Sequence, residues 1–496
     1  MATHMDPEEF RRHGHALVDW IADYWAGLPG RPVTPSEAPG AVAARLPAGP
    51  PERGDGLTGL LDDLNRVVLP GVTHWQHPGF FGYFPANTSG PSVLGDLASA
   101  GLGVQGMLWA TSPAATEVEI VMLDWLADAL DLPARFRSTS AGGGVIQDSA
   151  SSATLVAVLA ALHRASGGRW REAGVDRRYR VYASTQGHSS IEKAARIAGL
   201  GADGVHPVAV EPATLAMDPA ALRAAIEADR AAGVLPAIVV ATIGTTSTTA
   251  IDPLPAIGEL CREYGIWLHV DAAYAGSAAV CPELRWSHAG LEYADSYCFD
   301  PHKWLLTGFD CDAFWVADRA ELVAALTVLP EYLRNAASDS GAVVDYRDWQ
   351  VPLGRRFRAL KLWFVLRWYG VEGLRDHIRS GVGLAAEFAD LVRADDRFEI
   401  VTPHPFSLVC FRLRDGSPST GAADTDTDTD TDRVNAELLA RVNATGRIYL
   451  THTRVRDRYT LRLAVGAPAT TRETVEDAWR RIRDTATDLL DGKAAA

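Results

Sequence analysis

The chain has 496 residues, enough to bury a large core, and its formal net charge of −15 argues against binding to nucleic acid or to an anionic membrane surface. Its five cysteines form no CxxC pair, so reduced and mostly buried thiols are expected, and no apolar run is long enough to span a bilayer. The first residues are acidic and lack the basic flank and apolar run of a signal peptide, so we expect a cytoplasmic protein.

Residues 1–85 predict a helical arm. Residues 7–28 carry apolar side chains at helical spacing and end at a Gly-Leu-Pro-Gly stop. A linker rich in Pro and Gly leads to a second amphipathic helix, predicted over residues 57–69. Two helices too short to form a core must pack on another surface. The aromatic-rich segment 75–87 follows, and we expect Phe80 and Phe81 to be core residues.

From about residue 86 to residue 345, apolar strands alternate with Ala-rich helices, which is typical of a mostly parallel sheet covered on both faces. Near the start of this region, glycines 142–144 precede small hydroxyl-bearing residues that open an apolar helix. Free N–H groups and the helix dipole favour a phosphate there, although a simple capped helix has the same pattern. No Gly-Lys-Ser/Thr follows, so this is not a Walker loop.

Polar side chains also follow two further predicted strands. His188 comes after the strand 179–183, and it could stack on a flat cofactor or shuttle a proton, or it could simply cap a helix. Thr245 and Thr246 come after the strand 237–242. Ligands of open α/β sheets bind beyond the carboxyl ends of the strands, so these positions predict a shared site.

An aspartate and a lysine complete the set of strand-end residues. Asp271 ends the apolar strand 266–270, and Lys303 follows the next strand 32 residues later (303 − 271), beside apolar Trp304. Burial should lower the pKa of such a lysine and free its amine for a Schiff base. An aldehyde cofactor that acts as an electron sink needs this amine and a carboxylate on its pyridine nitrogen. The alternatives are a snorkelling lysine and a helix-capping aspartate.

Six motifs carry a resemblance to a known family: Pro-Gly-Val-Thr-His-Trp (70–75), Ala-Thr-Ser-Pro-Ala (110–114), Gly-Gly-Val-Ile-Gln (143–147), the stretch 267–277, Pro-His-Lys-Trp-Leu (301–305) and Pro-Leu-Gly-Arg-Arg-Phe-Arg (352–358). With them the chain closely resembles the aromatic L-amino-acid decarboxylases (group II decarboxylases), which depend on pyridoxal 5'-phosphate (PLP). The resemblance runs from about residue 9 to about residue 484.

The resemblance implies an α/β protein of PLP-dependent transferase fold type I, which is aspartate-aminotransferase-like. It divides the chain into an N-terminal helical dimerisation arm (1–85), a large PLP-binding domain with a mostly parallel sheet (86–350) and a small α+β C-terminal domain (351–496). It also implies an obligate homodimer with active sites at the interface, to which the partner subunit supplies the segment 102–109.

The resemblance assigns roles to single residues. Lys303 would hold PLP covalently, Asp271 would keep its pyridine nitrogen protonated, His188 would stack on the ring, and Tyr332, on a loop that closes over the substrate, would protonate Cα. The implied cofactor-binding residues are Ser149, Ala150, Ser151, Thr246, Asp271, Ala273, Asp300, His302 and Lys303. The implied substrate-binding residues are Trp75, Tyr83, Phe84, Pro85, Ala86, Gln105, Met107, His188, Leu353 and Gly354. No metal is expected.

Several residues depart from the family pattern. Ala86 stands in place of a threonine, Asp148 in place of a glycine in the phosphate loop, and Asp300 in place of an asparagine that often helps to hold the phosphate. Gln105 and Met107 replace residues that are often aliphatic and aromatic. A carboxylate repels a phosphate dianion unless it is protonated or turned away, so Asp300 either weakens cofactor binding or accepts a backbone hydrogen bond and faces elsewhere.

The rest of the chain predicts the smaller domain, with strands at 406–413 and 459–465 and a final helix at 473–490. We expect a basic cluster before the helix 360–369 to brace the domain junction; it comprises Arg355, Arg356, Arg358 and Lys361. A Thr-Asp repeat within residues 417–432 is typical of a disordered insertion, with a metal site as the alternative.

The predicted reaction is the decarboxylation of an aromatic L-amino acid to the arylalkylamine and CO2. Tryptophan, 5-hydroxytryptophan, phenylalanine, tyrosine and dihydroxyphenylalanine all remain open as substrates. One alternative is an oxygen-dependent aromatic acetaldehyde synthase, although such relatives tend to lack the tyrosine or the stacking histidine, and this chain has both Tyr332 and His188. The other is a non-catalytic member of the family. An aminotransferase would need a second half-reaction that the resemblance does not suggest.

Overall fold

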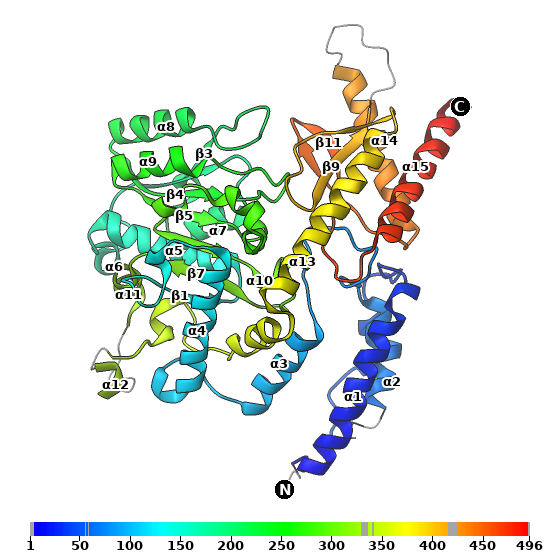
Figure 1. Cartoon of the computed structure of the whole chain (residues 1–496), viewed down its shortest axis with the longest axis horizontal. Coiled ribbons are helices and arrows are strands. Elements are labelled where there is room, and N and C mark those ends of the chain that lie inside the picture. The colour runs from blue at the N-terminus through cyan, green and yellow to red at the C-terminus, as the bar shows by residue number, and fades with distance from the viewer. Residues whose placement is uncertain are drawn as a thin grey trace.

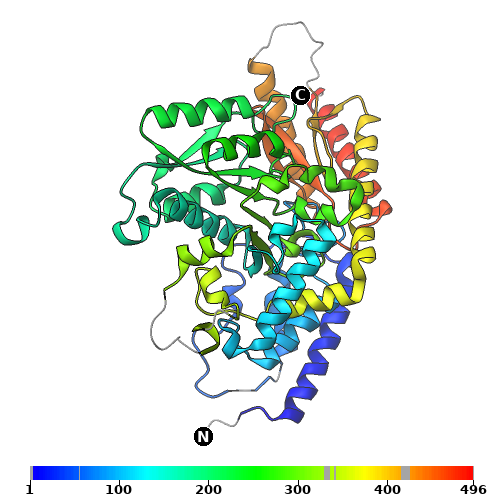
Figure 2. The same cartoon turned by 60° about the vertical axis from the view of Figure 1, so that its left-hand side comes forward.

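The computed structural model describes residues 4–54, 56–57, 59–328, 336–339, 342–414 and 425–494. A helical arm lies on the same side of the molecule as the C-terminal domain, and the large α/β domain lies beside both (Figures 1 and 2). The described residues include no helix long and apolar enough to cross a membrane.

The arm begins with α1 (Pro7–Gly27), whose first turn is closed by a capping box between Asp6 and Glu9. The second predicted helix is wrong in its extent and regularity. Gly59, with φ of 75°, delays its start, and Pro70 lies where it ends. What forms instead is α2 (Leu60–Asp63), a π turn (Leu64–Val68) and a 3₁₀ turn (Leu69–Gly71).

The large domain is built on a seven-stranded sheet with the order β1-β7-β6-β5-β4-β2-β3. Its strands are β1 (Gly143–Gln147), β2 (Tyr179–Ser184), β3 (Val205–Val208), β4 (Leu235–Thr242), β5 (Trp267–Asp271), β6 (Ser296–Phe299) and β7 (Asp312–Val316). All neighbours are parallel except β7, which runs antiparallel to both β6 and β1. The predicted mostly parallel sheet is confirmed.

Helices cover both faces of this sheet, and alternate strand residues point to opposite faces. Val239 packs in the core cluster that includes α8 and α9, whereas Val240 packs in the cluster that includes α5 and α7. Because both faces are covered, the strands are apolar almost throughout. The helices are α3 (Gly90–Leu102), α4 (Pro113–Leu130), α5 (Ala150–Ser166), α6 (Trp170–Ala173), α7 (Ser189–Ile197), α8 (Pro219–Ala231), α9 (Leu254–Tyr264), α10 (Pro301–Trp304), α11 (Arg319–Leu326) and α12 (Ala336–Asp339).

The helix α13 (Ala359–Arg393) connects the large domain to the small one, with a kink at Gly370 (φ 62°, ψ 175°; Figure 1). The small domain has an antiparallel sheet of order β10-β11-β9-β8, as expected for an α+β domain. Its elements are β8 (Phe398–Ile400), β9 (Leu408–Leu413), α14 (Thr425–Ala444), β10 (Thr451–Val455), β11 (Arg458–Ala464) and α15 (Arg472–Ala494).

The disorder predicted for the Thr-Asp repeat is wrong from Thr425 onward, because α14 begins there; residues 415–424 lie outside the described ones. The end of the repeat is held by basic partners. Asp432 lies 3.3 Å from Arg412 and 3.1 Å from Arg454, and it accepts a hydrogen bond from the backbone N–H of Tyr459 at 2.8 Å. The composition of the repeat does not show these contacts, because their partners are distant in the sequence. In the described part of the chain, no His, Cys, Asp and Glu side chains group as metal ligands.

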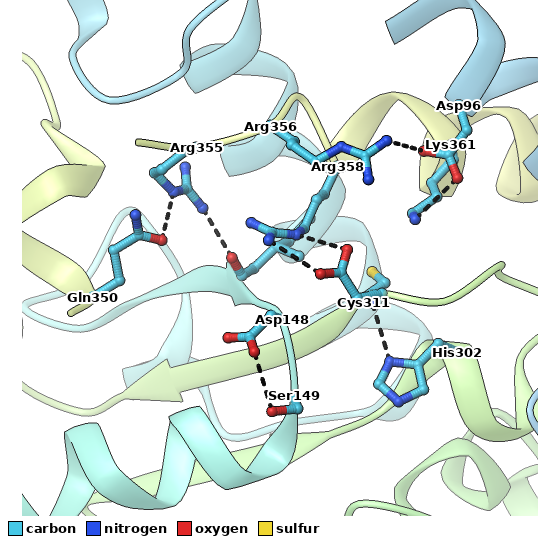
Figure 3. A network of polar contacts seen from close by, with 12 residues as sticks. Asp96, Asp148, Ser149, His302, Cys311, Gln350, Arg355, Arg356, Arg358 and Lys361 are labelled. Atoms are coloured by element: carbon cyan, nitrogen blue, oxygen red, sulfur yellow. Dashed lines mark hydrogen bonds and ion pairs between the residues drawn. The ribbon is translucent and has the colours of Figure 1, made fainter. Parts of the chain in front are cut away.

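The basic cluster pairs with acids of the large domain, as predicted for a brace (Figure 3). Arg355 and Glu119 form a buried pair at 2.7 Å. Arg358 binds Asp310 at 3.0 Å, and Lys361 binds Asp96 at 3.1 Å. Arg356 is exposed and lies 3.9 Å from Asp96.

We predict that Glu119→Ala lowers the free energy of unfolding by about 3–5 kcal/mol, because it leaves the Arg355 guanidinium buried without its counter-charge. Urea unfolding followed by tryptophan fluorescence measures the change. As a control, Arg356→Ala removes an exposed pair and should change stability by less than about 1 kcal/mol. Equal losses in the two variants would contradict the bracing role.

Candidate active site

A cavity of about 420 Å³ lies at the edge of the large sheet where β4, β5 and β6 end. It brings together most of the residues predicted for the site. Those on its wall are Trp75, Tyr83, Phe84, Pro85, Ala86, Ser149, Ala150, Ser151, His188, Thr246, Asp271, Ala273, Asp300, His302 and Lys303.

Lys303 lies on α10, in the first helical turn after β6. Its Nζ atom is 2.7 Å from Oδ2 of Asp300. Burial disfavours the ammonium form, but the charge of Asp300 and its hydrogen bond to Nζ, with the charge of Asp271, outweigh burial and raise the pKa of Lys303. The predicted lowering of this pKa is therefore wrong for the protein without cofactor, because the lysine is buried among carboxylates and not among apolar groups alone.

Asp271 ends β5 with its side chain buried, and its Oδ1 accepts a hydrogen bond from the backbone N–H of Ala273 at 3.0 Å. Burial raises the pKa of Asp271, and Lys303 partly offsets this. A cationic N–H group placed in the cavity would favour the ionised form of this carboxylate. The contact is to a backbone turn after the strand, so the helix-capping alternative does not describe it.

His188 is the N-cap of α7, and its Nδ1 accepts a hydrogen bond from the backbone N–H of Ser190 at 3.1 Å. Since Nδ1 is an acceptor, the neutral ring carries its proton on Nε2. Burial lowers the pKa of His188, while Asp271 and Lys303 act on it in opposite directions. The capping and the functional interpretations are therefore compatible, because the ring caps the helix and also lines the cavity.

The predicted phosphate seat is the N-terminus of α5, where Ser149 is the N-cap and its Oγ accepts from the N–H of Ser152 at 3.4 Å. The N–H of Ala150 donates to Oδ1 of Asp300 at 3.2 Å. Asp300 thus accepts a backbone hydrogen bond, as one of the two predicted alternatives required, but it faces Lys303 and the seat instead of turning away. Asp148 lies beside the seat and accepts from the Ser149 hydroxyl at 3.4 Å (Figure 3).

These residues fit PLP. The cavity offers a primary amine, a buried carboxylate for a ring N–H and a helix N-terminus for a phosphate, which are the groups that this cofactor needs. Thr242 also lines the cavity, and its hydroxyl is buried without a hydrogen-bond partner among the described residues. A bound ligand would satisfy such a group.

Part of the wall is aromatic. The Phe84 and Tyr274 rings stack with centroids 3.9 Å apart, and Tyr274 also stacks on Trp304 at 4.8 Å. Trp75 and Tyr83 stack at 5.4 Å. An apolar wall of this kind suits an aromatic side chain and keeps water from the site.

Sequence reasoning missed some cavity-lining residues: Ser190, Thr242, Gly244, Tyr274, Phe309 and Arg462. Arg462 interrupts the apolar strand β11, and that charge was the available signal. It is almost fully buried, lies over the Phe84 ring at 5.4 Å and donates to the carbonyl groups of Thr246 and Ser247. These bonds tie the small domain to the cavity wall.

Four predicted substrate-binding residues lie away from this cavity in the single chain: Gln105, Met107, Leu353 and Gly354. Oε1 of Gln105 accepts from the N–H of Arg355 at 2.6 Å, and a Cβ atom added at Gly354 would lie 3.1 Å from Nε2 of Gln105. The predicted contribution of Gln105 and Met107 to the partner subunit's site stays a prediction, and so does the predicted substrate contact of Leu353 and Gly354. Tyr332, the predicted proton donor, lies outside the described residues.

Comparison with known proteins agrees with this site. Residues 39–414 match the pyridoxal-dependent decarboxylase conserved domain. The chain is 45% identical to tryptophan decarboxylase 2 of Oryza sativa (98% of this chain, 96% of the other), 45% to the aromatic-L-amino-acid decarboxylase of Mus musculus (98% and 99%) and 46% to the phenylacetaldehyde synthase of Arabidopsis thaliana (98% and 97%).

Solved structures agree as well. The crystal structure of Oryza sativa TDC with PLP and tryptamine superposes with a TM-score of 0.94 at 43% identity, covering 99% of this chain and 100% of the other. That of Catharanthus roseus tryptophan decarboxylase with L-tryptophan gives 0.91 at 42% identity, covering 98% and 100%. With this agreement in sequence, fold and cofactor-binding groups, the chain belongs to the pyridoxal-dependent decarboxylase family.

Proposed function

We propose that this protein removes the α-carboxylate of an aromatic L-amino acid and releases the arylalkylamine and CO2. The observation that carries the proposal is the convergence of Lys303, Asp271 and His188 on one cavity with an aromatic wall. The relatives named as decarboxylases of tryptophan and of aromatic amino acids support this choice of substrate class.

Each residue has a defined task in this reaction. PLP, when bound, supplies the ring system that accepts the electrons left by the departing carboxylate. Lys303 would provide the amine that holds the cofactor. Asp271 is buried and accepts a hydrogen bond from the backbone N–H of Ala273, and its carboxylate would stabilise the protonated ring nitrogen of the cofactor. His188 presents Nε2–H to the cavity, and the aromatic wall around Phe84 limits water around the substrate carboxylate.

We predict that Lys303→Ala lowers kcat by at least about 10³-fold and removes the visible absorbance of covalently held PLP. Stopped-flow assays and absorbance spectra of the purified variant measure both effects. Lys193→Ala is the matched control, since this exposed lysine on α7 lies outside the cavity wall, and it should keep both properties. Retention of both by Lys303→Ala would overturn the proposed function.

The rival product is an aldehyde, because relatives include phenylacetaldehyde synthases. An aerobic mixture of tryptophan, 5-hydroxytryptophan, phenylalanine, tyrosine and dihydroxyphenylalanine, with products identified by mass and oxygen followed alongside, separates the two. We expect amine without oxygen loss, and a ranking of the substrates in one run. Tyr332→Phe should divert product from amine to aldehyde, since the proton donor to Cα is lost. An unchanged amine yield would exclude that role.

We also propose a homodimer held by the arm. None of the 21 residues of α1 is buried in the single chain. With α2 and α3 it frames an apolar groove of about 1170 Å³, in which Phe10 and Leu94 are 57% and 50% exposed. An apolar groove of this size marks an interaction surface. A second copy's arm is the occupant that we favour, because each arm presents the same unpaired apolar face.

We predict that Leu94→Glu shifts the protein from dimer to monomer in analytical ultracentrifugation, because it places a charge in the apolar groove. Trp286→Glu is the control, since Trp286 is 56% exposed but outside the groove, and it should sediment as the unaltered protein does. If the unaltered protein is itself a stable, active monomer, the dimer proposal fails.

A cytoplasmic location completes the proposal. All five cysteines are buried and free, as expected of a protein that folds where thiols stay reduced. Fractionation of the source cells tests this location.

A further inference from the structure

Asp312 is a buried carboxyl group that the proposed mechanism does not use. It is the first residue of β7, and because β7 is antiparallel, its beginning lies where β6 and β5 end. Its side chain is fully buried, and neither oxygen accepts a hydrogen bond from an N–H group or a hydroxyl of the described residues. A buried carboxylate without donors is costly, so its partner has to be of another kind.

The nearest carboxyl group along the sheet is that of Asp300, because Phe299 pairs with Ala313 across β6 and β7 and the next two residues at this end are Asp300 and Asp312, both fully buried. Two buried carboxylates on neighbouring strands repel each other, so one of the two groups carries a proton. Burial and then the charge of Asp300 raise the pKa of Asp312 well above its usual range. Burial opposes ionisation of Asp300 too, but Lys303 and His302 outweigh it and lower its pKa. In this structure the proton is therefore on Asp312.

The ionised Asp300 stands where a phosphate would bind. Its Oδ1 takes the N–H of Ala150 at the start of α5, and its Oδ2 takes Nζ of Lys303. A carboxylate here would repel the phosphate of PLP, whereas a protonated carboxyl group would donate a hydrogen bond to it. The proton that Asp300 needs is present on its neighbour.

We propose that Asp300 and Asp312 hold one proton in common, which rests on Asp312 while Lys303 is a free ammonium and passes to Asp300 when the cofactor phosphate binds at the N-terminus of α5. The O–H bond of Asp312 breaks as that of Asp300 forms, so no proton is taken up or released. Asp312 is thus a positioning residue that acts on the phosphate through Asp300. The inference rests on the cofactor assignment within the proposed function.

Other titratable groups face this pair from every neighbouring strand. Burial lowers the pKa of both His188 and His302, so their rings are neutral above pH 7. The pKa of Lys303 is raised, and burial raises the pKa values of the thiols of Cys298 and Cys311 and of the phenol of Tyr297. Among the residues that the structure describes, these groups are Asp271, His188, Tyr297, Cys298, His302, Lys303 and Cys311.

The pH dependence follows from the raised pKa of Asp312. The pair keeps its proton below that value and loses it as the pH rises through it, after which two negative charges stand beside the phosphate. PLP affinity should therefore fall as the pH rises through the raised pKa of Asp312, and stability from the protonated pair should be lost in the same direction.

The test is a titration of the full-length protein, freed of cofactor, with PLP between about pH 7 and pH 9, followed by tryptophan fluorescence. In Asp312→Asn the amide cannot give up a proton, Asp300 stays charged, and the Kd for PLP should rise about tenfold. The double variant Asp300→Asn/Asp312→Asn removes the charge and should return the Kd to within about threefold of the unaltered protein, without the decline at high pH.

Asp229→Asn is the matched control for lost stability. Asp229 is a buried aspartate that is bound by Arg180 and Tyr182 outside the cavity wall, and the variant should leave the Kd for PLP unchanged. If Asp312→Asn binds PLP as tightly as the unaltered protein across this pH range, or if the double variant is as weak as the single one, the shared proton is excluded.

Infrared spectroscopy of the cofactor-free protein gives an independent readout. The unaltered protein should show the C=O stretch of a protonated carboxyl group, and this band should be weaker in Asp312→Asn by the contribution of one carboxyl group. Asp252 and Asp271, whose pKa values are also raised, are present in both proteins. A band of equal strength in the two proteins would overturn the shared proton while leaving the decarboxylase proposal intact, since no substrate or cofactor takes part in the measurement.

Discussion

The charge balance around Lys303 is the constraint on which the site depends. One ammonium lies among Asp271, Asp300 and Asp312, which come from the ends of three neighbouring strands. The ionised groups Lys303, Asp271 and Asp300 would each cost several kcal/mol without their neighbours, so the three strand ends must keep their alignment. The register that pairs Asp271 with Cys298 in the next strand therefore serves the electrostatics of the site as much as the packing of the sheet.

In the seven-stranded sheet, β7 runs antiparallel to its neighbours, and this affects the charges around Lys303. A parallel strand at its place would bring its last residue to the cavity edge, whereas β7 brings its first, Asp312. The same reversal sets Asp312 opposite Gln147 of β1, next to the loop that leads into α5. The sheet topology thus places an extra carboxyl group behind the phosphate seat, and the bracing pair Arg355–Glu119 holds β1 there through the N–H and carbonyl groups of Ile146.

The sequence predicts the strand-end residues well because their signal is local. Lys303, Asp271, His188 and Ser149 each follow an apolar run, and parallel strand ends share one edge. The sign of the pKa shift of Lys303 could not be predicted, because it is set mainly by the contact between its Nζ atom and Asp300, which the sequence does not show. Arg462 and Tyr274 likewise reach the cavity through tertiary packing alone. In the arm, Gly59 and Pro70 limit the second helix. At the Thr-Asp repeat, the helix ion-pairs with arginines that are distant in the sequence, such as Arg412.

The arm and the substrate pocket are linked through α3. Leu94 of this helix faces the apolar groove, Gly95 packs so closely on Lys361 that a Cβ atom would lie 2.5 Å from its backbone, and the helix leads directly to Gln105. The bond from Gln105 to the N–H of Arg355 then joins this segment to the brace. In the proposed dimer, covering the groove would therefore also fix the segment that carries Gln105 and Met107. In that dimer, the cover over the apolar groove and the position of this segment would depend on the same helix, α3.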